Sequence, residues 1–248
     1  ASLRAKMLLA PIALAALATS RPLVSSRTVP TTRRVASPPR LAAAAPFEGD
    51  GWLKLEDELN KLPVFTVGNE AGQPLQYKIG ERPLAIFYAD VDAAKKELAT
   101  TKSQNPDLEC DLVPVGLGSA YKLSCDGKAM VVPSLTELRA AGAPENAQPM
   151  GQELPLFACM EMSRDGDGGP VLPVFMSYAD CAAAVAQATD ADTPDSPLEI
   201  SGLSLSSVVD QLSGPSSGAF SFVAPSASIK HVDSYVGQGV YWRPVEDE

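Results

Sequence analysis

One unit of sequence occurs twice in this chain of 248 residues, and this duplication limits the possible fold more than any other feature. The motif Leu-Pro-Val-Phe at 62–65 returns as Leu-Pro-Leu-Phe at 154–157, and further matched residues follow each copy. A period of about 90 residues is too long for a solenoid or propeller repeat, so we expect two homologous α/β halves related by a pseudo-twofold axis. Such a body has a groove between its halves, where we expect function to lie. The matched pairs are Phe65 with Phe157 (92 positions apart), Phe87 with Phe175 (88), Asp92 with Asp180 (88) and Ser134 with Ser226 (92).

The first 46 residues differ from the rest in composition, because they contain seven Lys or Arg and no Asp or Glu. Residues 4–18 are typical of a secretory signal: Arg4 and Lys6 precede an apolar run at 7–18 that is too short to span a membrane. Residues 19–46 are rich in Ser, Thr, Arg, Pro and Ala, the composition of a transit peptide. We therefore expect a disordered bipartite targeting presequence over 1–46. A simple signal or transit peptide followed by a Pro-rich linker is the alternative, and a true start at Met7 would weaken the signal assignment.

The body that follows is strongly acidic. Of the 20 Lys and Arg in the chain, 13 remain after the seven of the leader are subtracted, against 30 Asp and Glu, so residues 47–248 carry a formal charge of −17. This charge argues against binding of nucleic acid. No apolar run in the body reaches membrane-spanning length, which predicts at most a peripheral association with membranes.

Apolar periodicity and turn residues divide the body into four parts. We expect an N-terminal amphipathic helix over 47–61, a first α/β half over 62–143, a second half over 154–237 and an acidic tail over 238–248. Leu55, Leu59 and Leu62 share the apolar face of the first helix. Strands are predicted at 63–67, 75–79, 83–88, 111–115, 129–132, 154–162, 171–176 and 219–223, and helices at 90–101, 117–123, 133–143, 177–188, 202–212 and 224–237.

Residues that carry chemistry are few. The four cysteines lack a CxxC spacing and there is a single histidine, so a zinc site is not expected. Cys110 and Cys125 flank a short apolar stretch and could form a disulfide in an oxidising compartment, with free buried thiols as the alternative. The DGDGG segment at 165–169 lacks the ligands of a calcium loop and is interpreted as a hairpin turn. His231 has Asp233 nearby but no nucleophile motif, so we expect a surface or capping histidine, no catalytic residue and no cofactor.

The order of the motifs resembles a known family. A helix precedes Leu-Pro-Val-Phe; there follow Phe-Tyr-Ala-Asp at 87–90, Val-Pro-Val-x-Leu-x-x-x-Tyr-x-Leu at 113–123, Val-Pro-Ser at 132–134 and the second copy at 154–157. This order is similar to that of the twenty-two-kilodalton component of the translocon at the inner chloroplast envelope (Tic). The resemblance covers about residues 55–187. It implies a duplicated α/β fold with apolar pockets, no cofactor, and a chaperone-like role for precursor proteins in the intermembrane space of the plastid envelope. The acidic stretch at 189–197 departs from that pattern.

The repeated aromatic and neighbouring methionine residues are the candidate binding site. We expect them to line an apolar cleft that holds extended client segments, whereas the alternative is that they pack in the core. The predicted partners are unfolded precursor proteins and translocon subunits. The alternative function is a plastid scaffold for a fixed partner such as a photosynthetic complex, and the alternative compartments are the stroma and the thylakoid lumen. The candidate residues are Phe65, Phe87, Phe157, Phe175, Met160 and Met176.

Overall fold

The computed structural model describes residue 47 and residues 50–79, 82–166, 169–188, 198–213 and 220–237. The predictions for the presequence at 1–46, the acidic stretch at 189–197 and the tail at 238–248 lie outside these residues. Within them, no helix combines the length and the apolar character that crossing a membrane requires.

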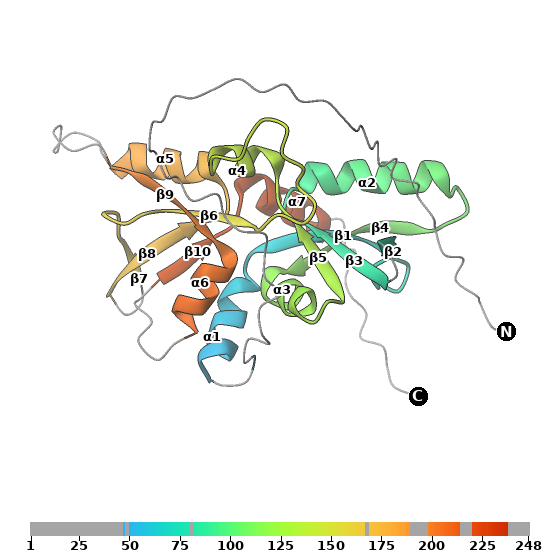
Figure 1. The fold of residues 1–248 in the computed structure, drawn as a ribbon, viewed down its shortest axis with the longest axis horizontal. Helices are drawn as coiled ribbons and strands as arrows, with labels where there is room; N and C mark the ends of the chain where they lie inside the picture. Colours follow the sequence, from blue (N-terminus) through green and yellow to red (C-terminus); the bar gives the residue numbers. More distant parts are fainter. Residues whose placement is uncertain are drawn as a thin grey trace, which may run out of the picture.

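Two similar α/β halves follow an N-terminal helix, which confirms the duplicated fold (Figure 1). In each half the third strand pairs antiparallel with the first two strands and parallel with the fifth, and the first strand also pairs antiparallel with the fourth. The first half contains α1 (Asp50–Leu59), β1 (Pro63–Asn69), β2 (Gln76–Ile79), β3 (Arg82–Tyr88), α2 (Val91–Gln104), β4 (Cys110–Gly116), α3 (Leu117–Cys125), β5 (Ala129–Val132) and α4 (Leu135–Ala140). The second contains β6 (Pro155–Cys159), β7 (Arg164–Gly166), β8 (Gly169–Phe175), α5 (Tyr178–Ala188), β9 (Ile200–Ser204), α6 (Leu205–Leu212), β10 (Phe220–Val223) and α7 (Ser226–Gly237).

The strand register corrects three of the four sequence matches by one residue. Phe65 of β1 lies opposite Tyr88 of β3, and Phe157 of β6 lies opposite Phe175 of β8. The counterpart of Phe175 is therefore Tyr88, 87 positions earlier, and not Phe87. A shift of one residue along a strand moves a side chain to the other face of the sheet. Phe87 accordingly packs in the core between the halves, whereas Phe175 packs on the opposite face of its own sheet.

The matches of Asp92 with Asp180 and of Ser134 with Ser226 are also wrong by one residue. Asp90 caps α2 and Ser177 precedes α5, an offset of 87, so Asp92 and Asp180 occupy different positions in the first turn. In the parallel pairs, Tyr88 lies opposite Val132 and Phe175 opposite Val223, which gives an offset of 91 for the segments that include Ser134 and Ser226. The Phe65 and Phe157 pair keeps the offset of 92.

Some element boundaries also differ from the sequence prediction. The strand predicted at 154–162 ends at Cys159, and the helix predicted from Gly202 begins at Leu205 because β9 continues to Ser204. Strand β7 was not predicted. Pro133 does not start α4, because Ser134 is its N-cap and its hydroxyl accepts a hydrogen bond from the Thr136 N–H (3.2 Å).

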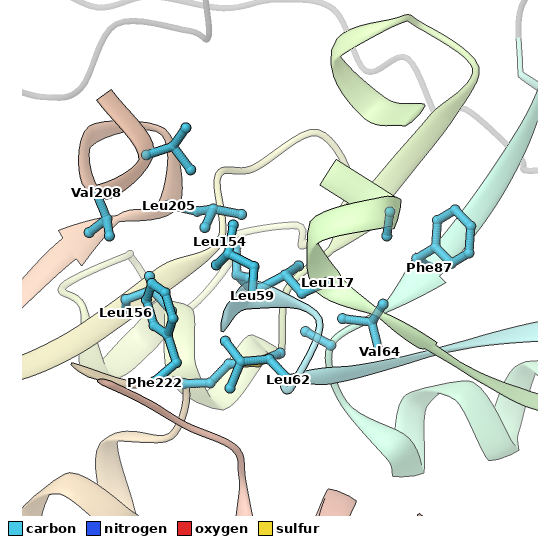
Figure 2. Packing of buried hydrophobic residues seen from close by; sticks show 14 of the residues in the cluster. Leu59, Leu62, Val64, Phe87, Leu117, Leu154, Leu156, Leu205, Val208 and Phe222 are labelled. Atoms are coloured by element: carbon cyan, nitrogen blue, oxygen red, sulfur yellow. The ribbon is translucent and has the colours of Figure 1, made fainter. Parts of the chain in front are cut away.

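A single apolar core joins the two halves. Helices α1, α3 and α6 lie on one side of the sheets and α2, α4, α5 and α7 on the other (Figure 1). Under the first of these layers, side chains of α1 pack with residues of both halves, as Figure 2 shows around Leu59. Helix α1 thus fills the space in which the sequence suggested a groove. The labelled core residues are Leu59, Leu62, Val64, Phe87, Leu117, Leu154, Leu156, Leu205, Val208 and Phe222.

The last helix of each half packs against the sheet of the other half. Val232 of α7 joins the cluster formed by Phe65 of β1, Val91, Ala94 and Leu112. In the opposite direction, Ala141 at the end of α4 lies against Gly202 of β9, and the Glu137 carboxylate of α4 accepts a hydrogen bond from the Tyr178 N–H at the start of α5 (2.7 Å). Helices α4 and α7 thus each contact the other half, on the side of the sheets remote from α1.

Candidate functional site

The predicted cleft residues do not come together on an open surface. Phe87 and Met176 are buried in the core shared by both halves, Phe65 is buried under α2 and α7, and Phe157 and Phe175 are buried under α5. Met160 alone is exposed, with 56% of its surface accessible. Because helices cover both faces of each sheet, these aromatic residues form packed core and not the wall of an open cleft. Binding of a client by them stays a prediction.

The cysteines give no cross-link. Cys110 on β4 and Cys125 at the end of α3 are both free, so the possible disulfide is absent. Burial raises the pKa of both thiols, which keeps them protonated near neutral pH. In the part of the chain that the structure describes, no group of three or more His, Cys, Asp or Glu lies close enough to hold a metal ion.

The structure instead has an apolar groove formed by residues that the sequence analysis did not single out. It has a volume of about 260 Å³ and lies where the end of α1, the start of β1, the end of β4 and α7 meet. Residues from both halves form it, since α7 comes from the second half. The lining residues are Asn60, Lys61, Pro63, Pro114, Val115, Gly116, Ile229 and Val232.

The walls of this groove are mainly aliphatic. Ile229 has 41% of its surface exposed, although it belongs to a helix that packs on a sheet. Val232, one turn further along α7, packs into the cluster that contains Phe65. The groove is smaller than most sites for drug-sized ligands, so it is suited to one or two apolar side chains of a longer chain.

The edge of β4 beside the groove is closed to an added strand. Pro114 lies directly opposite Phe65 and has no N–H, so its nitrogen must face the free edge of the sheet. Two residues earlier, the Leu112 N–H donates to the Asp111 carboxylate (2.8 Å) and is already satisfied. An occupant would therefore bind through side-chain packing and not through β-strand addition.

The groove belongs to a body that has an excess of acidic residues. The one cation in its lining, Lys61, forms an ion pair with Glu58 on the exposed surface of α1. The adjoining elements carry charges of both signs, namely Lys54, Glu56 and Asp57 in α1, Asp111 in β4, and Lys230 and Asp233 in α7. The acidic excess of the whole body favours a positively charged occupant over an acidic one.

His231 of α7 is half-buried beside Val232, which lines the groove. Its ring packs edge-on against Phe65, with 5.4 Å between the ring centroids. Its Nε2 atom is buried and has no hydrogen-bond partner among the described residues. Burial, followed by the nearby Lys95 ammonium, lowers the pKa of His231 below its usual value, while Asp111 and Asp92 act in the opposite direction.

We predict that acid weakens the docking of α7 through His231. A histidine whose pKa is lower in the folded protein contributes stability above its unfolded pKa of about 6.5, and that stability is lost as the pH falls towards the folded pKa. The midpoint of urea unfolding should therefore fall between pH 7.5 and pH 5 by more in the wild type than in His231→Gln. Equal falls in both proteins would show that other groups cause the acid sensitivity.

Comparison with solved structures identifies the fold class as that of Tic22. Tic22 from Plasmodium falciparum superposes with a TM-score of 0.62 at 18% identity, over 75% of this chain and 99% of that chain. Anabaena Tic22, described as a protein of protein transport, superposes with a TM-score of 0.57 at 18% identity, over 73% of this chain and 96% of that chain. No protein-family model and no curated protein matches the chain by sequence. The resemblance inferred from the motif order is thus confirmed at the level of the fold.

Proposed function

We propose that this protein is a plastid protein-import factor that binds unfolded precursor segments transiently, in a chaperone-like manner. The observation that carries the proposal is the open aliphatic groove between β4 and α7 on a Tic22-like fold. The Anabaena neighbour, described as a protein of protein transport, supports the same direction.

The expected client is a basic chain that carries apolar side chains. One such side chain would enter the groove against Pro114, Val115 and Ile229, while positive charges on either side of it would face the acidic surface of the body. The groove can bury the area of one or two side chains, so binding should be weak and reversible. Weak binding suits a factor that has to release its client.

The proposed place of action is the intermembrane space of the plastid envelope, with translocon subunits as the membrane partners. The composition of residues 1–46 supports an organellar address. The proposal assigns the protein no enzymatic activity and no cofactor.

We predict that Ile229→Ser lowers the affinity for a basic apolar peptide by about tenfold, because it removes an aliphatic wall of the groove and leaves the net charge unchanged. All three apolar clusters lie between residues 47 and 232, so a chain of residues 47–248 contains the whole described core and can serve as the binding protein. The probe is a fluorescein-labelled synthetic peptide with the sequence of residues 4–21, which holds three basic and no acidic residues. Fluorescence anisotropy would give the dissociation constant.

The matched control is Met160→Ser, which makes a similar change at an exposed apolar residue of the second half, outside the groove lining. It should leave the affinity within about twofold of the wild type, and a peptide in which Glu replaces the basic residues should not bind. Equal losses for both variants would remove the groove from the proposal. If the wild type bound no peptide and instead copurified from plastids with a single stable complex, the scaffold function would replace the import function.

A further inference from the structure

Four helices begin close together on the side of the sheets remote from α1 (Figure 1). Helices α2 and α4 follow β3 and β5, which are neighbouring parallel strands, and α5 and α7 follow β8 and β10, which are also parallel neighbours. The carboxyl ends of parallel strands meet at one edge of a sheet, so the two helices of each pair start side by side. A hydrogen bond between the first turns of α4 and α5 brings the two pairs together.

Two aspartates satisfy backbone groups at these helix starts. Asp90 accepts a hydrogen bond from the Asp92 N–H (2.9 Å) and caps α2. Asp180 of α5 accepts two hydrogen bonds from Ser226 at the start of α7, one from its N–H and one from its hydroxyl (2.9 Å each). Each carboxylate is favourable at a helix N-terminus, because it faces the positive end of the helix dipole. Together they place negative charge where the two halves meet.

Glu137 adds a third carboxylate, and it links the two halves directly. It belongs to α4 of the first half and accepts a hydrogen bond from the Tyr178 N–H of α5 in the second half (2.7 Å). Its side chain is half-buried, and the charges of Asp180 and Asp90 both act on it. Among the residues that the structure describes, none of these three carboxylates forms an ion pair with Lys or Arg. The repulsion among them is therefore not offset by a neighbouring cation.

The surroundings of Glu137 favour its neutral form. Burial raises the pKa of Glu137 above its usual value, and the charges of Asp180 and Asp90 act in the same direction. Hydrogen bonds from the Tyr178 N–H and the Ser177 hydroxyl oppose this shift but do not cancel it. The protonated carboxyl still has an oxygen that can accept from the Tyr178 N–H. Protonation thus removes the repulsion and keeps the link between α4 and α5.

We propose that Glu137 is a pH-sensitive contact between the halves, which tightens when the carboxyl takes up a proton and loosens when it is ionised. A carboxyl whose pKa is raised in the folded protein contributes stability below its unfolded pKa of about 4.3, and this contribution is lost as the pH rises through the folded pKa. The response is opposite to that of His231, whose protonation weakens the docking of α7. Acid therefore strengthens the contact that α4 makes with the other half and weakens the one that α7 makes. The inference does not depend on what occupies the groove.

The amide signal of Tyr178 reports the titration of Glu137 directly, because the two groups share a hydrogen bond. In ¹H–¹⁵N spectra of the full chain, its chemical shift should show a titration step with a midpoint above about 4.3. That step should be missing in Glu137→Gln. A midpoint at or below the usual glutamate value, or the same curve in the glutamine variant, would overturn the proposal.

Unfolding and hydrogen exchange measure the effect on the contact itself. Glutamine keeps an acceptor for the Tyr178 N–H but has no charge, so Glu137→Gln should raise the midpoint of urea unfolding at about pH 8, with a smaller gain at about pH 5. Amide exchange in the first turn of α5 should be slower than in the wild type at the higher pH. The matched control is Glu145→Gln, which removes the same charge from an exposed residue shortly after α4. Equal gains in both variants would mean that net charge, and not this contact, is responsible, and would also overturn the proposal.

Asp180→Asn provides a second test that leaves Glu137 in place. Asparagine can accept from the Ser226 N–H and donate to its hydroxyl, so the start of α7 stays capped while one charge disappears. The midpoint of the Tyr178 titration should then fall towards the usual glutamate value. In the double variant with Glu137→Gln, the gains in stability near pH 8 should be less than additive, since each substitution removes the same repulsion. An unmoved midpoint would contradict the convergence of carboxylates on which the proposal rests.

Discussion

Replacing Leu59 by alanine is expected to lower the free energy of unfolding by about 2–5 kcal/mol, because it removes a fully buried leucine and leaves a cavity. Leu59 belongs to α1 but packs in the core that contains residues of both halves, such as Leu117 and Leu154 (Figure 2). Both halves should therefore lose stability together. Urea unfolding followed by far-ultraviolet circular dichroism should remain one transition, with a lower midpoint, and hydrogen exchange should accelerate in β1 and β6 alike.

The control lies on the same helix. Leu53 has 56% of its surface exposed, so Leu53→Ala should change the free energy of unfolding by no more than about 0.5 kcal/mol. Two separate transitions in Leu59→Ala, or faster exchange confined to β1, would contradict a shared core and would favour two independently stable halves.

The shared core explains why the duplication did not produce a cleft between the halves. Each half is a small α/β unit that can bury only a modest apolar surface by itself. Helix α1, which has no counterpart in the second half, supplies Trp52, Leu55 and Leu59 to the junction. The groove that we propose as the client site lies instead on the outer face, where α7 crosses from one half to the other.

The sequence was sufficient to predict the two halves and most of their elements. The strand signals at 63–67 and 129–132 come from residues that are neighbours in the sequence, and so does the acidic first turn of α2. The structure has β1, β5 and α2 at these places. The order of motifs was likewise enough to predict the fold class. Local chemistry therefore fixed which elements form and their order.

Contacts between elements could not be predicted in the same way. The sequence match of Phe87 with Phe175 rested on residue type and paired side chains that lie on opposite faces of their sheets. The face of each residue follows only from the strand pairing, in which Phe65 lies opposite Tyr88 and Phe157 opposite Phe175. The groove forms where α7 of the second half meets the ends of β1 and β4, which is a contact between distant parts of the chain. A proline inside a predicted strand was the one local signal available, since it marks an edge strand.

A second large effect is expected where α3 begins. A Cβ atom on Gly116 would lie 2.3 Å from Oδ1 of Asn60 and 2.8 Å from its Cα, so Gly116→Ala forces a displacement that includes backbone. That Oδ1 atom accepts a hydrogen bond from the Ser119 N–H (2.9 Å) and caps α3 in place of Gly116, which has no side chain. We predict a loss of about 1–3 kcal/mol from overpacking, with about 1 kcal/mol more if the cap is broken. Urea unfolding of the purified variant measures the sum.

Two companion variants show whether contact with Asn60 causes the loss. Gly202→Ala places a Cβ at an ordinary 3.8 Å from Ala141, so it should change the stability little. Asn60→Ala removes the colliding side-chain atoms and the cap but keeps the Cα atom, so the double variant with Gly116→Ala should lose less than the sum of the single variants. Strict additivity would mean that Gly116 is needed for another reason. A positive coupling would establish that the turn after α1, which also supplies Asn60 and Lys61 to the groove, is held in place by the start of α3.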